Sequence, residues 1–166
     1  MSRWLSRTEE LPPGTMLHGR YEIRYVVGSG GMGIVYRTWD TVQGTDTAVK
    51  ELYPETCCKR GIDGKNVELF SKNAILQYQD WKKHFLLEAD TMSGFSDCPN
   101  LLASTDFFEE NNTYYYVAEI LDGMALNAYL DSREKPLAQE EASHIAVNVM
   151  DALAYLHKRR LIHRDI

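Results

Sequence analysis

The chain has 166 residues, of which 44% are hydrophobic, and this is enough for one ordinary globular domain with its own core. Its formal net charge of −6 gives no reason to expect nucleic acid or an anionic membrane as a main partner. No apolar run approaches the roughly 18 residues that a membrane span needs, and no signal peptide is evident. The three cysteines and five histidines lack metal-ligand spacing and a disulfide pattern, so we expect a cytoplasmic protein without a metal site.

The N-terminal third of the sequence predicts a tail followed by strands. Residues 1–14 read as a polar tail that ends in two prolines and a glycine. Three runs rich in β-branched and aromatic residues then predict strands at 21–27, 34–39 and 45–51. The turn at 41–44 indicates that the second and third strands form an antiparallel meander.

The middle of the chain predicts one helix and two further strands. Residues 52–73 have no firm period, so we expect an irregular insertion there. Spacings of three and four then predict one face of a helix that starts near Gln77 and ends at Gly94, made of Trp81, Phe85, Glu88, Ala89 and Met92. Strands at 101–109 and 113–121 would complete an α+β fold with a five-stranded antiparallel sheet and one inserted helix.

After residue 123 the pattern becomes helical. Residues 125–131 can form a short helix, and a longer helix is predicted by an apolar stripe formed by Ala142, Ile145, Ala146, Val149, Met150, Leu153 and Leu156. The basic residues 158–160 suit the C-terminus of that helix electrostatically. We expect the stripe to pack in a core.

A glycine-rich motif follows the first strand, and its candidate phosphate-binding residues are Val27, Gly28, Ser29, Gly30, Gly31, Met32, Gly33, Ile34 and Val35. A G-x-G-x-x-G pattern alone fits dinucleotide-binding proteins, kinases and ordinary glycine-rich hairpins. The residues after Gly33 start a strand better than a helix, which disfavours a nicotinamide-dependent oxidoreductase. Glycines in such a hairpin let backbone N–H groups approach phosphates without obstruction.

Two further motifs give the glycine loop its context. Ala48-Val49-Lys50 lies on the third strand, and His163-Arg164-Asp165 follows the long helix. In this order and separation, the three motifs resemble the N-terminal half of a protein kinase, from about Leu11 to the end. Residues 11–21 and the glycine loop look most like bacterial kinases of the eukaryotic type. The resemblance implies a kinase-like fold with an ATP-binding N-lobe at 15–121 and the hinge exit and first helices of a truncated C-lobe at 122–166.

The resemblance also implies roles for individual residues. Lys50 would contact the α- and β-phosphates of ATP and pair with Glu88 on the inserted helix, for which Glu68 and Asp90 are less convincing alternatives. Asp165 would orient the substrate hydroxyl and accept its proton.

By the same resemblance, strand 113–121 runs into the hinge. Glu119 and Leu121 would offer backbone groups to the adenine edge, while Val35 and Ala48 would pack against its faces. Ala118 would then be the gatekeeper and leave a back pocket open to bulky inhibitors, although a one-residue slip would remove that assignment.

The function implied is transfer of the γ-phosphate of Mg²⁺-bound ATP to a serine or threonine hydroxyl of a protein substrate. The family's metal-binding asparagine and D-F-G segment would lie beyond Ile166, so we expect these 166 residues alone to be inactive and the last helices to be poorly supported, whereas the parent protein would be active. The alternative is a non-catalytic nucleotide-binding or interaction module.

Overall fold

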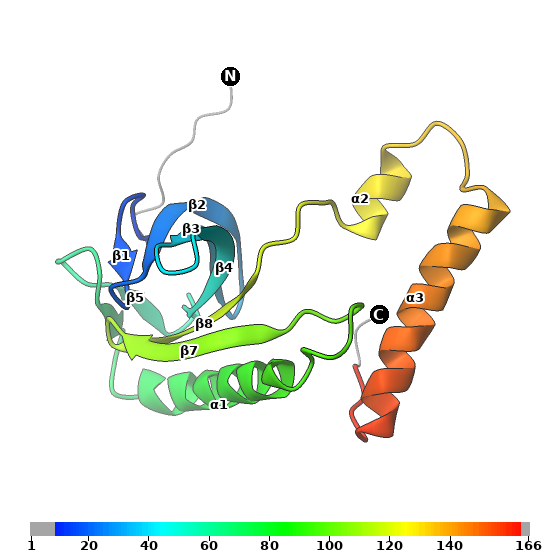
Figure 1. Ribbon diagram of the computed structural model, residues 1–166. Coiled ribbons are helices and arrows are strands. Elements are labelled where there is room, and N and C mark those ends of the chain that lie inside the picture. Colours follow the sequence, from blue (N-terminus) through cyan, green and yellow to red (C-terminus); the bar gives the residue numbers. More distant parts are fainter. Residues whose placement is uncertain (1–8, 164–166) are drawn as a thin grey trace. The chain divides into compact units, whose positions relative to one another are not determined.

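The computed structural model describes residues 9–163 (Figure 1). The chain divides into two compact units. Residues 9–94 and 103–120 belong to the first unit, and residues 95–102 and 121–163 belong to the second.

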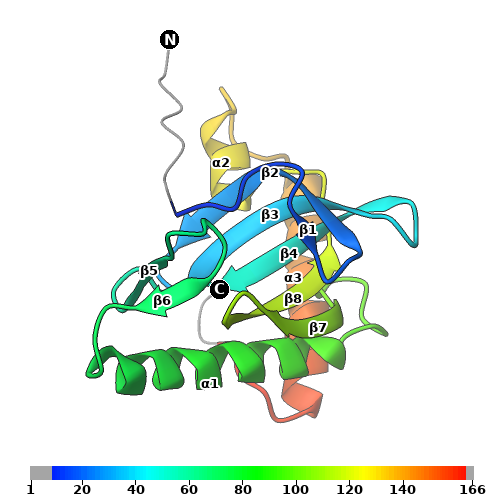
Figure 2. The ribbon, with the colours of Figure 1, turned by 90° about the vertical axis from the view of Figure 1, so that its left-hand side faces the viewer.

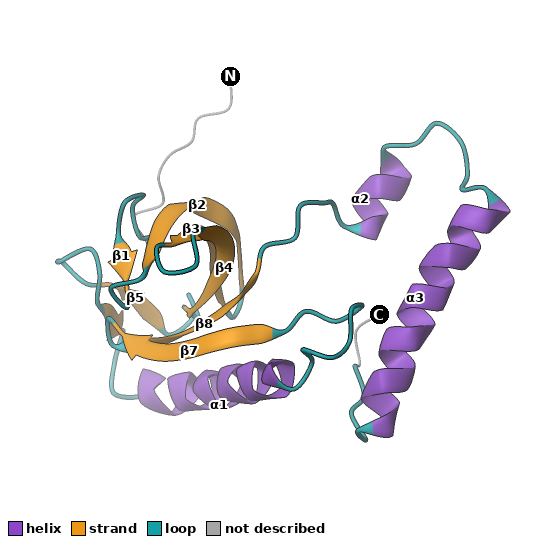
Figure 3. Ribbon diagram, viewed as in Figure 1, coloured by secondary structure: helices purple, strands orange, loops and turns teal. Residues whose placement is uncertain are grey.

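The first unit contains a six-stranded antiparallel sheet in the order β1-β2-β3-β4-β8-β7 (Figure 3). The five strands expected from the sequence are all present, and a two-residue strand, β1, extends one edge. The bounds are β1 (Met16–Leu17), β2 (Tyr21–Gly30), β3 (Gly33–Asp40), β4 (Thr45–Leu52), β7 (Ser104–Glu110) and β8 (Thr113–Glu119). The α+β fold with an antiparallel sheet and an inserted helix is confirmed.

Alternation along the central strands separates two faces of the sheet. Ile34, Tyr36 and Val49 are buried on one face and contribute to the core. Val35 pairs with Lys50 between β3 and β4, and both residues are half-buried on the other face. Because directly paired residues share a face of an antiparallel sheet, Val35 and Lys50 lie together on this second face, whereas Ile34, which was also expected at the nucleotide site, has its side chain in the core on the first face.

Helix α1 (Ala74–Ser93) lies beside β7 in both views of the first unit (Figures 1 and 2). It begins three residues before Gln77, where the periodicity starts, and it ends at Gly94 as expected. Phe85 and Ala89, both on the expected apolar face, are buried in the core. This packing holds the C-terminal half of α1 against the sheet.

The N-terminal segment corrects one expectation. Of the polar tail expected at 1–14, residues 1–8 lie outside the described residues, and Leu11 is only 1% exposed and belongs to the core. Its backbone N–H donates a hydrogen bond to the hydroxyl oxygen of Tyr36 at 3.1 Å. The proline-glycine composition hides this contact, because a single leucine gives no periodic signal.

The insertion at 52–73 is also more regular than expected. It contains a two-stranded antiparallel sheet formed by β5 (Cys58–Arg60) and β6 (Val67–Leu69). The carboxylate of Asp63 accepts the backbone N–H groups of Lys65 and Asn66 in the connecting turn, each at 2.9 Å. Strands of three residues are too short to show an alternating pattern, which explains why the sequence suggested an irregular segment.

The second unit contains α2 (Leu126–Asp131) and α3 (Gln139–Lys158), at the positions expected. Acidic residues in the first turn of α3 and basic residues in its last turn both suit the helix dipole. Of the apolar stripe, Leu156 is buried, whereas Val149 is 39% and Met150 is 57% exposed. The expectation that the stripe packs in a core is therefore wrong for most of its length. Within residues 9–163, no helix combines the length and apolar character needed to cross a membrane.

Candidate functional site

The glycine-rich motif is a hairpin, as the sequence predicted. β2 and β3 pair up to Gly30 and Gly33, which leaves Gly31 and Met32 as the turn. The backbone carbonyl of Met32 accepts a hydrogen bond from Tyr53 N–H at 3.1 Å, which ties the turn to the end of β4. A strand therefore follows Gly33, and this arrangement differs from the helix that opens after the glycines of a dinucleotide-binding fold.

The glycines of this hairpin have two different roles. A Cβ atom on Gly33 would lie 2.0 Å from the carbonyl oxygen of Glu51, so this position requires glycine for close strand packing. A Cβ atom on Gly28, Gly30 or Gly31 would meet nothing within 4 Å. A register shift between Val26 and Gly28 leaves Val27 outside the regular pairing, and its side chain is 53% exposed. The three unhindered glycines leave the backbone of the loop accessible to a ligand.

Lys50 and Glu88 form an ion pair that joins β4 to α1. The Nζ atom of Lys50 donates to Oε1 of Glu88 at 2.8 Å and to Oε2 at 3.0 Å. The two side chains are 20% and 34% exposed, respectively, so the pair remains accessible from solvent. Glu68 lies instead 3.8 Å from Lys59. The partner expected for Lys50 from helical spacing is thus the one that it contacts.

Tyr116, which sequence reasoning missed, is a third member of this cluster. Its hydroxyl donates to Oε1 of Glu88 at 2.8 Å, and its ring lies 5.1 Å from the ring of Phe85. Lys50 Nζ lies 5.4 Å from the centre of the Tyr116 ring, within cation–π range. Burial, together with the nearby charge of Glu88, raises the pKa of the Tyr116 hydroxyl, so it acts as a neutral donor. Tyr116 could have been identified from the sequence only if the pairing of β4 with β8 had been known, because this pairing places Tyr116 opposite Lys50.

Two of the residues expected near adenine, Ala48 and Ala118, lie opposite each other on neighbouring strands. Ala48 pairs with Ala118 between β4 and β8, and Ala118 is 2% exposed. Glu119 follows as an exposed residue at the end of β8. Leu121 belongs to the second unit and is 67% exposed. The slip that would have displaced Ala118 from the face of Lys50 has not occurred.

The opposite face of β4 carries a second charged cluster, which the sequence did not predict. Glu51 is fully buried, and its carboxylate accepts two hydrogen bonds from Arg60, at 2.7 and 2.8 Å. The hydroxyls of Tyr36 and Tyr115 donate to the same carboxylate at 2.7 and 2.9 Å. Arg60 also donates to the backbone carbonyl of Glu9. Neighbouring residues of β4 thus hold two separate ion pairs, one on each face of the sheet.

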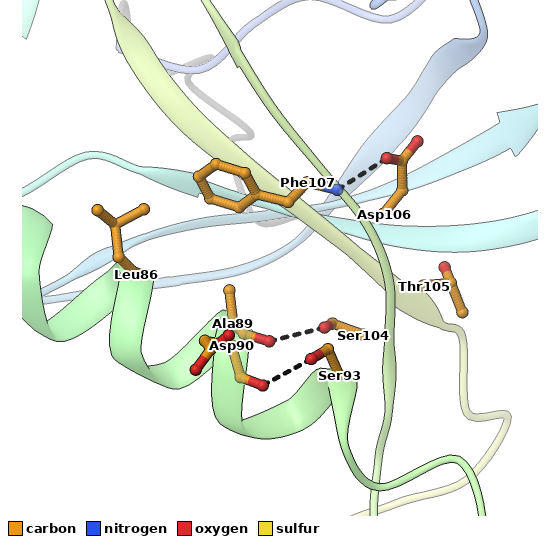
Figure 4. A pocket seen from close by; sticks show the side chains of 8 residues that line it. All are labelled: Leu86, Ala89, Asp90, Ser93, Ser104, Thr105, Asp106 and Phe107. Carbon is orange, nitrogen blue, oxygen red and sulfur yellow. Dashed lines mark hydrogen bonds between the residues drawn. The ribbon is translucent and has the colours of Figure 1, made fainter.

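A cavity of about 450 Å³ lies between α1 and β7. Figure 4 shows the side chains that line it. Its lining comes from one side of α1 and from one end of β7: Leu86, Ala89, Asp90, Ser93, Ser104, Thr105, Asp106 and Phe107. The expected nucleotide-binding residues do not line it, so it is distinct from the glycine loop and the Lys50–Glu88 pair. Asp90, the other alternative partner for Lys50, lies here.

The second unit carries His163 of the third motif, which is exposed and lines a cavity of about 270 Å³ with residues of α3 that include Ala152 and Leu156. Arg164 and Asp165 lie outside the described residues, so the expected role of Asp165 stays a prediction. Between residues 9 and 163, no group of three His, Cys, Asp or Glu side chains is placed to hold a metal ion.

Comparison with known proteins agrees with this geometry. A family model described as the protein kinase domain matches residues 21–166. The chain belongs to the protein kinase family. The kinase chain is 31% identical over 153 residues to the serine/threonine-protein kinase PrkC of Bacillus subtilis, which covers 92% of this chain and 20% of that protein. It is 30% identical to the probable serine/threonine-protein kinase PknB of Lactococcus lactis, over 92% of this chain and 21% of that protein. The kinase chain thus spans about a fifth of the length of these curated relatives.

Solved structures are similar to this chain in fold. The structure described as the apo form of PpkA-294 has a TM-score of 0.88 and 28% identity, over 95% of this chain and 55% of that one. The PknI kinase domain of Mycobacterium tuberculosis has a TM-score of 0.66 at 23% identity, over 95% of this chain and 55% of that one, and supports the fold alone. The kinase chain therefore spans just over half of the structures that it matches.

Proposed function

We propose that this chain contributes the ATP-binding part of a serine/threonine protein kinase, which transfers the γ-phosphate of ATP to a hydroxyl of a protein substrate. The observation that carries the proposal is the ion pair of Lys50 with Glu88, at 2.8 and 3.0 Å, on the same face as the glycine hairpin. Active kinases need this lysine–glutamate pair in place. The names of PrkC and PknB support serine and threonine as the acceptor class.

ATP would be contacted by residues of the glycine loop, of the strands β3, β4 and β8, and of the segment that follows β8. Backbone N–H groups of the unhindered glycine loop would bind phosphate oxygens, and the Lys50 ammonium, already oriented by Glu88, would contact the α- and β-phosphates. Val35 and Ala48 would pack on adenine, with backbone groups of Glu119 and Leu121 at its edge. Ala118, a small residue at the gatekeeper position, would leave room behind adenine for bulky inhibitors.

The phosphate-transfer step would use Asp165 to orient the substrate hydroxyl and accept its proton. Magnesium ions neutralise charge on the phosphates when bound. In the family pattern their ligands are the asparagine and D-F-G aspartate, for which no residue of this sequence is a candidate. We therefore expect a polypeptide of these 166 residues alone to bind ATP without transferring phosphate.

The test is thermal protection by nucleotide, followed through tryptophan fluorescence. ATP at a hundred times its dissociation constant should stabilise the folded chain by about 2.7 kcal/mol, whereas NADH should not stabilise it. Lys50→Met should remove most of the ATP effect, because the ammonium that contacts the phosphates is lost. Lys59→Met, at an exposed lysine paired with Glu68, is the matched control and should behave as the unchanged chain. Protection by NADH but not by ATP would overturn the kinase proposal.

A further inference from the structure

The Glu88 carboxylate is held from the sheet by two different residues. Lys50 of β4 donates to both oxygens, and the Tyr116 hydroxyl of β8 donates to Oε1 at 2.8 Å. Lys50 and Tyr116 are directly paired across the two strands, so their side chains leave the same face of the sheet. Both then reach the same carboxylate on α1. The helix is therefore attached to the sheet by an ion pair from Lys50 and by a hydrogen bond from the uncharged hydroxyl of Tyr116.

Packing around the Tyr116 ring also holds the hydrogen bond from its hydroxyl to Glu88 in place. Tyr116 is 6% exposed, and its ring packs against Phe85, which is fully buried and lies one turn before Glu88 on α1. A buried hydroxyl without an acceptor is costly, so the bond to Glu88 fixes the carboxylate as much as it satisfies the tyrosine. Phe85, Tyr116 and Glu88 thus form one contact area between α1 and β8.

We propose that Tyr116 is a positioning residue that keeps Glu88, and with it α1, in place when the Lys50 ammonium engages the phosphates of ATP. This inference rests on the proposed function. A phosphate competes with Glu88 for the three N–H donors of Lys50, and the contact of β4 with α1 weakens as those donors turn to the ligand. The hydroxyl bond does not use the lysine, so it preserves the carboxylate that orients the ammonium.

The role predicts an effect on phosphate recognition that is separate from adenine recognition. Adenosine lacks the groups that Lys50 contacts, whereas ATP carries them. The ratio of the affinity for ATP to the affinity for adenosine therefore measures how well Lys50 is presented. A residue that only supports the fold would change both affinities together and would leave the ratio as it is.

The decisive variant is Tyr116→Phe, which removes the hydroxyl and keeps the ring against Phe85. Isothermal titration calorimetry of the whole chain should show ATP affinity reduced about fivefold to tenfold, the size of effect that corresponds to the net contribution of one typical hydrogen bond, with adenosine affinity unchanged. Tyr115→Phe is the matched control, because it removes the neighbouring hydroxyl that donates to Glu51 on the opposite face. This control should lower stability and leave the affinity ratio unchanged. If Tyr116→Phe does not fold, Tyr116→Met also lacks the hydroxyl and should lower the same ratio.

The Lys50→Met background separates failure of this inference from failure of the proposed function. There the phosphate contact is already lost, so adding Tyr116→Phe should reduce ATP affinity no further. If Lys50→Met lowers the affinity ratio and Tyr116→Phe does not, the positioning role is wrong and the kinase proposal stands. If the unchanged chain binds ATP no better than adenosine, the phosphate site itself is refuted.

Discussion

At the scale of single residues, two neighbouring side chains of β4 face different environments. Lys50 is half-buried beside the glycine loop, where a ligand can compete for its donors. Glu51 is fully buried, and its carboxylate is surrounded by Arg60 and two tyrosine hydroxyls. The first pair can exchange partners, whereas the second would leave a buried charge without compensation if it opened. Alternation along one strand therefore places an exchangeable ion pair and a fixed one side by side in sequence.

The fixed pair makes a sharp prediction. Arg60→Met should reduce the free energy of unfolding of the first unit by about 3–5 kcal/mol, because Glu51 would keep its charge in the core without a counterion. Lys59→Met is the control one residue away: the Lys59 side chain is 57% exposed and its ammonium lies 3.8 Å from Glu68, so the loss should stay below about 1 kcal/mol.

Urea unfolding monitored by tryptophan fluorescence measures both effects, since Trp39 and Trp81 lie in the first unit. If Arg60→Met and Lys59→Met cost the same, the buried pair does not have the energetic role assigned to it. The variant carrying both Glu51→Gln and Arg60→Met should be more stable than Arg60→Met alone, because it removes the unpaired charge.

At the scale of elements, the glycine hairpin separates a folding requirement from a binding requirement. Gly33→Ala should destabilise the first unit by about 1–3 kcal/mol, because the added Cβ would lie 2.0 Å from the Glu51 carbonyl oxygen and the strands would have to move apart. Gly30→Ala should leave stability nearly unchanged, since its Cβ would meet nothing within 4 Å. Thermal unfolding of the two variants compares them directly. Equal loss of stability would show that close packing at Gly33 is not the reason for its glycine.

The long elements of the first unit could be predicted from the sequence, and the shortest ones could not. Strands β2, β3, β4, β7 and β8 were predictable because alternation and turn residues repeat over seven or more positions. Glu88 was predictable because the kinase resemblance implies an acidic partner for Lys50 on the inserted helix, and helical spacing put Glu88 on the face that meets the sheet. The β5–β6 pair was not, because each strand has three residues.

The contacts of Arg60 and Tyr116 depend on pairing between distant segments, which periodicity within one segment does not specify. Arg60 meets Glu51 only once the insertion folds back over the sheet, and Tyr116 meets Glu88 only once β8 pairs with β4 in register. In the sequence alone, Arg60 reads as an ordinary surface residue and Tyr116 as an ordinary core residue. The strand register, rather than composition, identifies them as partners of charged groups.

At the scale of the whole molecule, the two units differ in how much apolar surface they bury. In the described part of the second unit, the buried hydrophobic residues are Phe95, Cys98, Ala152 and Leu156, and several apolar residues of α3 are exposed. The first unit has an extended core around the sheet and α1. Smaller apolar burial gives smaller stability, so the units should not unfold together.

Urea titration should therefore give two transitions. Part of the helical circular dichroism signal should be lost at lower urea than the tryptophan fluorescence, because residues 95–166 contain no tryptophan and the fluorescence reports the first unit. ATP should move the fluorescence transition to higher urea, since the proposed phosphate-binding groups lie in the first unit. Coincident transitions by both probes would contradict independent unfolding.

The segment before β1 has a mechanical consequence. Two N–H groups of Arg60 donate hydrogen bonds to the backbone carbonyl of Glu9, and the Leu11 N–H donates to the Tyr36 hydroxyl oxygen. Arg60 and Tyr36 in turn both donate hydrogen bonds to the carboxylate of Glu51, which is next to Lys50 in β4. A load applied at Glu9 would therefore be transmitted to the middle of the sheet rather than to its edge. Tension at this residue would reach β4, the strand that presents Lys50.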